Sequence, residues 1–175
     1  MVLGDIIKKL ETAAPEDFAQ DWDNVGLLVG DRAQDITKVY IALDADEAAI
    51  AQAQACGAQL LLTHHPLIFS PLKRINTDQF ISARVVELLR TGMSCYAMHT
   101  NYDAARMGVL AAQRLGIPAE APLGDLFERG GCQYGIGSVG DTDNPLTLAD
   151  LGAQVKDRFG LQTVKIFGDL SGQVQ

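Results

Sequence analysis

The first stretch of the chain alternates apolar and polar residues with the period of a helix. Apolar side chains stand at Leu3, Ile6, Ile7 and Leu10, and this three- and four-residue spacing places them on one helix face. We therefore predict an amphipathic helix that ends before Pro15, because proline is poorly tolerated inside a helix.

Short, continuous apolar runs follow, and their length and residue types are typical of buried strands. The runs are residues 27–29, 39–43, 60–63 and 93–98. Helical patterns separate the last three runs. The first of these helices is predicted to start at a cap on Asp44 and to end near Gly57, and the second to start at a cap on Asn76 and to end at Gly92.

A further helix is predicted after the last run, opening at Asp103 and ending at Gly116. Strands that alternate with helices in this way form parallel sheets with right-handed crossover connections. The predicted fold class is therefore α/β, with a parallel or mixed sheet and flanking helices.

Proline and glycine residues concentrate between residues 118 and 131 and predict a domain boundary there. We expect an N-terminal α/β domain over residues 1–120 and a second, similar α/β unit over residues 130–175. In the second unit the patterns predict a strand at 132–139, a helix at 147–159 and a strand at 163–167. Because the sequence stops soon after that strand, this unit is expected to be incomplete.

The charge balance excludes several classes of function. Fourteen basic and 22 acidic residues give a net charge of −8. A general nucleic-acid binder usually carries a basic face, and anionic membrane surfaces attract basic segments, so neither partner is expected. With 47% hydrophobic residues, the chain has enough apolar material for a packed core.

Cysteine use and the N-terminal sequence predict a cytoplasmic protein. The three cysteines, Cys56, Cys95 and Cys132, are odd in number and widely spaced, which does not suit a disulfide framework. The N-terminus lacks the basic and then apolar layout of a signal peptide. No run approaches the ~18 apolar residues of a membrane span.

All three histidines of the sequence stand directly after predicted strands, in the runs His64-His65-Pro66 and His99 to Asp103. In open parallel sheets, ligands gather outside the carboxyl ends of the strands. Imidazoles and carboxylates bind divalent metals. The two runs therefore predict a metal site with His64, His65 and Asp103 as ligands.

A purely structural alternative is that each run is only the polar segment that follows a strand, with imidazoles hydrogen-bonded to nearby backbone. For His64-His65-Pro66 by itself this alternative is favoured, since short motifs often match by chance. The second run, at the end of a neighbouring strand, shifts the balance to metal. His99 is predicted to orient water or face the substrate rather than to bind metal, because metal ligands need such partners.

Other polar residues carry weaker hypotheses, each with an ordinary structural alternative. Asp23 lies in a sequence typical of a turn that could approach the site, and Asp44 could line it or only cap a helix. Lys73 and Arg74 could meet substrate phosphates, or lie on solvated surface. This basic pair also leaves open the alternative that the protein is a generic phosphoesterase with an unrelated dinuclear metal site.

The segments 22–27, 64–69 and 99–103, which read WDNVGL, HHPLIF and HTNYD, resemble hallmark motifs of the GTP cyclohydrolase 1 type 2 homolog family, also called NIF-like proteins. The resemblance covers residues 3–116 well and is looser afterwards. It implies an α/β fold of two similar domains, assembled into a homohexameric ring around dinuclear metal sites. By position, His64, His65 and Asp103 match metal ligands of the family, and His99 matches a nearby site histidine.

The resemblance also implies a function and its cofactors. A complete site would hold two divalent ions, of zinc, iron or manganese, and would hydrolyse a small molecule such as the nucleotide GTP. Family members complete the site with a C-terminal histidine and glutamate, but no histidine follows His99 here. Full occupancy is therefore not expected from this chain alone. The alternative function is a non-catalytic metal-binding scaffold or regulatory interaction protein.

Overall fold

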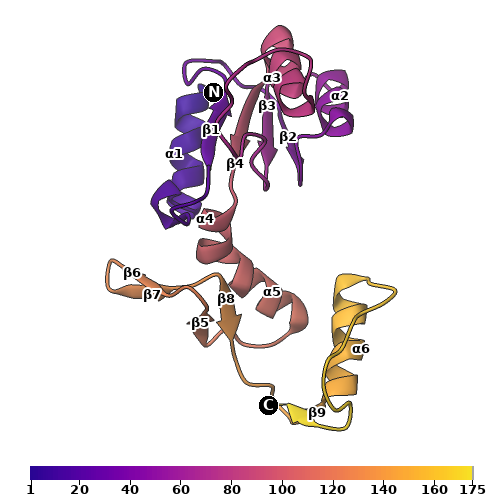
Figure 1. Ribbon diagram of the computed structural model, residues 1–175. Helices are drawn as coiled ribbons and strands as arrows, with labels where there is room; N and C mark the ends of the chain where they lie inside the picture. The colour runs from indigo at the N-terminus through magenta and orange to yellow at the C-terminus, as the bar shows by residue number, and fades with distance from the viewer. Residues whose placement is uncertain (175) are drawn as a thin grey trace. The chain divides into compact units, whose positions relative to one another are not determined.

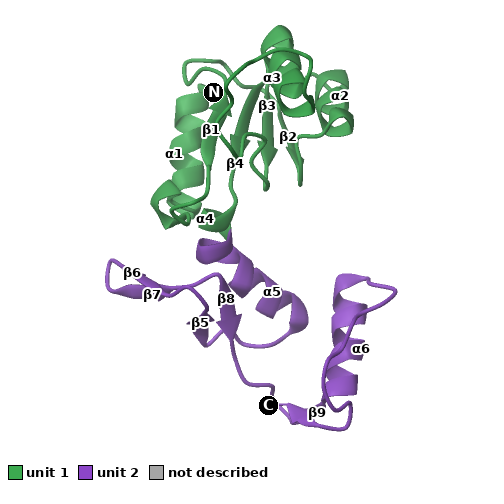
Figure 2. Ribbon diagram, viewed as in Figure 1, with its two compact units in different colours: residues 1–102 green, residues 103–175 purple. Residues whose placement is uncertain are grey.

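The computed structural model describes residues 1–174 and forms two compact units, Met1–Tyr102 and Asp103–Gln175 (Figures 1 and 2). The division falls before residue 120, where the sequence predicted the first domain to end. The reason is that helix α5 (Gly108–Leu115), which the prediction assigned to the first domain, packs against strand β8 (Gly137–Val139) of the second unit.

The first unit contains a four-stranded mixed sheet with strand order β1-β4-β3-β2. Strands β2, β3 and β4 run parallel, while β1 pairs antiparallel with β4. This arrangement confirms the predicted α/β class with a mixed sheet. Its helices and strands are α1 (Leu3–Ala13), a 3-10 turn (Glu16–Phe18), β1 (Gly26–Val29), β2 (Val39–Ala42), α2 (Glu47–Ala55), β3 (Leu60–Thr63), α3 (Phe80–Thr91), β4 (Ser94–Ala97) and α4 (Thr100–Tyr102).

Helices cover both faces of the central strands (Figure 1). Leu61 of β3 and Cys95 of β4 belong to the core cluster formed with α2 and α3. Because side chains alternate along a strand, Leu60 and Tyr96, which are also fully buried, face the side of α1. The central strands are therefore buried on both faces, which explains why they read as continuous apolar runs.

The ends of two helices differ from the prediction. Asp46, not Asp44, caps α2 by accepting a hydrogen bond from the backbone of Ala49 at 2.7 Å. Helix α3 begins after Gln79, which makes no side-chain cap, whereas Asn76 bonds to Asp78 in the preceding loop. Both helices were predicted in the right place, but the capping residues were wrong, because several polar residues near each start could cap equally well.

The second unit is built from short strands and two longer helices. Its elements are a π-helical turn (Asp103–Met107), α5, β5 (Ala121–Leu123), β6 (Phe127–Arg129), β7 (Cys132–Tyr134), β8, β9 (Leu146–Thr147), α6 (Leu148–Phe159) and β10 (Gln173–Val174). Helix α5 approaches β8 closely, since a Cβ on Gly108 would lie 2.8 Å from the Gly137 carbonyl carbon. The strands pair antiparallel as β5 with β8, β6 with β7 and β9 with β10.

Two predictions for the second unit were wrong. The strand predicted at 132–139 is divided into β7 and β8, because the backbone at Gly135 lies against the carbonyl oxygens of Leu123 and Gly124. Residues 163–167 form no strand. Their alternating apolar side chains lie instead against α6, where Ile166 contacts Gly152. The predicted helix at 147–159 is confirmed, with Thr147 as its cap.

Within residues 1–174, no helix is long and apolar enough to cross a membrane.

Adjacent leucines in α3 allow a direct test of the core. Leu88 is fully buried, whereas Leu89 is 57% exposed. Leu88→Ala is expected to lower the free energy of unfolding by about 2–5 kcal/mol, because it removes buried methyl groups and leaves a cavity. Leu89→Ala is the matched control and is expected to change it by less than about 1 kcal/mol. Urea unfolding of both variants measures the difference, and equal losses would contradict this packing.

Candidate metal centre

The parallel pairing of β3 with β4 brings the two histidine runs together. Thr63 and Ala97 are partners in the register, and the Met98 amide extends the ladder by donating to the Thr63 carbonyl at 2.9 Å. His64 and His99 therefore leave the sheet side by side, with ring centroids 5.2 Å apart. This confirms that both runs lie at the carboxyl ends of neighbouring strands.

His65 joins them because the chain bends where β3 ends. On a regular strand, consecutive side chains point to opposite faces. Here the Thr63 hydroxyl donates to the His65 carbonyl at 2.9 Å, which holds the bend. The His65 ring lies 5.1 Å from that of His64 and 5.6 Å from that of His99. One ring nitrogen from each residue lies within 4.8 Å of the others.

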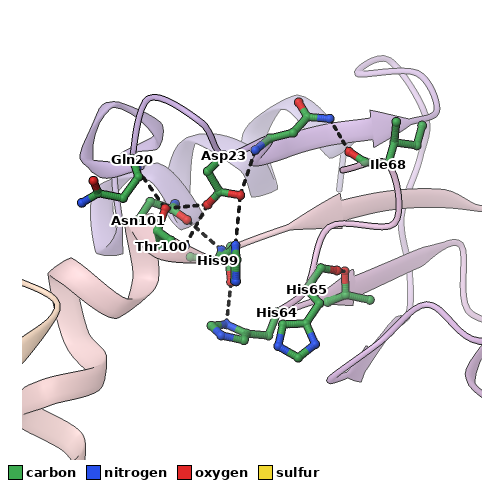
Figure 3. Close-up of polar contacts among 11 residues, drawn as sticks. Gln20, Asp23, His64, His65, Ile68, His99, Thr100 and Asn101 are labelled. Atoms are coloured by element: carbon green, nitrogen blue, oxygen red, sulfur yellow. Dashed lines mark hydrogen bonds and ion pairs between the residues drawn. The ribbon is translucent and has the colours of Figure 1, made fainter. Parts of the chain in front are cut away.

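Each of the three rings bonds to an oxygen atom through Nδ1, and Figure 3 shows the bonds of His64 and His99. His64 Nδ1 lies 2.9 Å from the Met98 carbonyl oxygen. His65 Nδ1 lies 2.8 Å from Oδ1 of Asp44, and His99 Nδ1 lies 2.9 Å from Oδ1 of Asp23. A carbonyl or carboxylate oxygen accepts, so Nδ1 donates its proton in all three cases.

This pattern determines which nitrogen of each neutral imidazole is basic. With the proton on Nδ1, the lone pair is on Nε2. Histidine ligands of metal ions usually donate the other ring N–H to a carboxylate or carbonyl in this way, which fixes the ring and raises its basicity. The donor set of His64, His65 and His99 therefore fits a divalent ion that accepts nitrogen ligands.

Asp23 is the most firmly held of these oxygen acceptors. Its side chain is fully buried, and its Oδ2 accepts from both the backbone and the hydroxyl of Thr100, at 3.1 and 2.5 Å. Burial raises the pKa of Asp23, but hydrogen bonds from Thr100, His99 and the Asn24 backbone together outweigh it, so that the pKa lies below its usual value. Asp23 is therefore a carboxylate at neutral pH, as the orientation of His99 requires.

Asp44 holds His65 in a more open setting. The two side chains are about half exposed, so water screens their interaction more than that of Asp23 with His99. Asp44 had been predicted mainly as a helix cap. The cap is instead Asp46, which leaves Asp44 free to bond to His65.

Thr100 and Asn101 stabilise the site through hydrogen bonds to neighbouring segments. The Thr100 hydroxyl accepts from the Gln20 backbone at 3.0 Å, and the Asn101 side chain accepts from the His99 backbone and donates to the Ala14 carbonyl. Both residues are buried. The turn before β1 is thereby tied to the end of β4 (Figure 3).

The structure groups His99 with His64 and His65, although the sequence suggested a role for His99 outside the ligand set. Asp103 is the first residue of the second unit and starts the π-helical turn rather than a helix of its own. Its assignment as a metal ligand stays a prediction. Lys73 and Arg74 line a separate hollow with Asn76 and other residues of the 71–79 loop.

The carboxylates of Asp23 and Asp44 were underrated from sequence alone. Asp23 is 76 residues from His99 along the chain, and only the pairing of β1 with β4 brings them together. A signal was present, however, since Asp44 directly follows the predicted strand 39–43 and Asp23 lies four residues before the predicted strand 27–29.

A family model for Duf34/NIF3 (NGG1p interacting factor 3) matches residues 1–175, the whole chain. The protein belongs to the DUF34/NIF3 family. The resemblance inferred from the three motifs is thereby confirmed.

Similar proteins carry the name GTP cyclohydrolase 1 type 2 homolog. The one from Clostridium perfringens is 33% identical over 98% of this chain and 65% of its own length. The one from Lactococcus lactis is 34% identical over 95% of this chain and 62% of its own length. This NIF3-family chain thus spans less than two thirds of the length of these curated relatives.

Solved structures share the fold. A Bacillus cereus protein related to NIF3 superposes with a TM-score of 0.86 at 20% identity, covering 99% of this chain and 74% of that one. Reduced HcgD from Methanocaldococcus jannaschii has a TM-score of 0.66 at 27% identity, covering 85% of this chain and 64% of that one.

Removing the charge on Asp23 should weaken metal binding. Asp23→Asn loses the carboxylate that orients His99, and loss of such a partner typically lowers metal affinity about 10–100-fold. Asp31→Asn is the matched control, because Asp31 caps an exposed turn through the Ala33 amide and asparagine can do the same. Competition with a zinc-binding dye measures both affinities. Equal affinities in the two variants would show that Asp23 does not orient a ligand.

Proposed function

We propose that this NIF3-family protein is a metal-dependent hydrolase that acts on a nucleotide or a related small molecule. The observation that carries the proposal is the set of three imidazoles at one sheet edge, each with Nδ1 bonded to an oxygen. The names of the relatives, GTP cyclohydrolase 1 type 2 homolog, favour hydrolysis of GTP as the first reaction to test.

His64 and His65 would hold the ion, and Asp103 would add a carboxylate. His99 would bind the same ion or hold water or substrate beside it. Asp23 and Asp44 would keep their imidazoles in the required tautomer. Nitrogen and oxygen donors suit zinc, iron or manganese, and two ions would need further ligands. A bound divalent ion would supply Lewis acidity and lower the pKa of a bound water.

Metal content and turnover test the proposal together. The purified protein is expected to contain at least one divalent ion per chain at neutral pH, rather than the two ions of a complete site, and to hydrolyse GTP. His65→Ala is expected to lose the metal and to reduce turnover at least about 100-fold, while Asp31→Asn retains both. Elemental analysis and a product assay give the two readouts. Absence of metal from the folded wild-type protein would overturn the proposal.

The second candidate function is a metal-binding scaffold or regulatory interaction protein. It is favoured by the family description, which names an interacting factor. Stoichiometric metal without turnover of GTP or other nucleotides would select this function over hydrolysis.

We also propose that the protein self-associates, as a homohexamer by resemblance to its family. Support comes from edge strand β2 and the residue that follows it, where Ile41 is 74% and Leu43 is 61% exposed. An unpaired apolar edge is prone to associate with another chain.

Light scattering of the purified protein tests this assembly. A mass well above that of one 18.8 kDa chain is expected, and Ile41→Lys should reduce it by placing a charge on the apolar face. Leu89→Lys is the matched control, because it adds the same charge to an exposed position of α3. A monomeric wild-type protein would exclude the proposal.

A further inference from the structure

Two large aromatic side chains stand exposed next to the histidine cluster. Trp22 is 58% and Phe69 is 54% exposed, and they come from different loops, one before β1 and one after β3. Their ring centroids lie 6.0 Å apart. Single exposed apolar residues are ordinary, but adjacent large ones mark binding surfaces more often.

Within this aromatic pair, Trp22 is in direct contact with the site, and Phe69 lies beside Trp22. The centroids of the Trp22 and His99 rings lie 6.2 Å apart, and the interplanar angle is 76°. The two rings therefore meet edge to face. Trp22 and Phe69 are tilted by 51° rather than stacked, so neither ring covers the face of the other. Open aromatic faces beside polar groups are typical of small-molecule sites.

The same short segment fixes the aromatic pair and orients the site. Asp23, which follows Trp22, accepts from His99 and Thr100. Asn24, the next residue, donates from its side chain to the Ile68 carbonyl at 2.5 Å, directly before Phe69 (Figure 3). Both loops are thereby held against the histidine cluster, and the rings are positioned before any ligand arrives. Such preorganisation lowers the entropic cost of binding.

We infer that Trp22 and Phe69 recognise a flat heteroaromatic ring of the ligand and hold it beside His99. The inference rests on the proposed function, since it assigns the substrate class of the same site. A ring stacked on Trp22 would extend its edge toward the imidazoles. An aliphatic acid has no flat face, and a sugar has no π-system, so the pair favours a heteroaromatic ring over either ligand.

Trp22 is the only tryptophan in the sequence, so its fluorescence reports on this surface directly. The probes are adenosine, which carries a flat ring, and ribose, which does not. Titration of the 175-residue protein with adenosine should change the emission to saturation, and ribose should leave it unchanged. Equal responses to the two probes would overturn the inference.

Phe69→Leu keeps the fluorophore and removes one wall. It is expected to weaken adenosine binding about tenfold, as loss of one stacking partner typically does, while Phe69→Tyr restores it. Phe80→Leu is the matched control, because Phe80 is also exposed but contacts Arg84 instead. Equal effects of the two leucine variants would contradict the inference. A Trp22 emission that changes with protein concentration and not with adenosine would also contradict it. That result would assign the aromatic pair to an interface between copies of the chain.

Metal content, measured on the same samples, separates this inference from the proposed function. Phe69→Leu should retain the metal of the wild-type protein. Stoichiometric metal without saturable adenosine binding would refute the aromatic surface alone. Saturable adenosine binding without metal would refute the metal-dependent function and leave the surface standing.

Discussion

The parallel pairing of β3 with β4 is the interaction on which the site depends. Its register aligns Thr63 with Ala97, so the two chains leave the sheet at the same level and carry His64 and His99 to one place. A shift of one residue would turn every side chain of a strand to the opposite face. Because both faces of these strands are buried, such a shift would force side chains of different size to repack on each face, and the core therefore positions the histidines.

The oxygen acceptors add a second constraint, which concerns the rings rather than the backbone. An imidazole at a strand end can rotate and can carry its proton on either nitrogen. Asp23, Asp44 and the Met98 carbonyl each hold one Nδ1, which selects the rotamer and the tautomer together. Asp23 has the strongest hold, because it is buried and accepts several hydrogen bonds.

The segment from Trp22 to Asn24 combines three roles in consecutive residues. Trp22 presents an aromatic ring, Asp23 orients His99, and Asn24 ties the loop that carries Phe69. Metal chemistry and ligand recognition would thus share one support. The segment is therefore as important to the site as the two histidine runs, although it contains no histidine.

The sequence by itself determined the local elements of the first unit and the two histidine runs. The spacing of apolar residues and the length of apolar runs reflect which side chains are buried. This pattern is present in each segment of the sequence, whichever segments it packs against. The same local information predicted helix ends at Gly92 and Gly116, where glycine adopts a left-handed backbone conformation.

Only the tertiary structure decided which polar residues meet. Asp44 and Asp46 are equally plausible caps in the sequence, yet one caps α2 and the other bonds to His65. Asp23 reaches His99 because β1 pairs with β4. In the second unit, residues 163–167 have the pattern of a strand, but they pack against α6. Hydrogen-bond partners and strand neighbours depend on residues distant in the chain, so the local pattern contains too little information to select them.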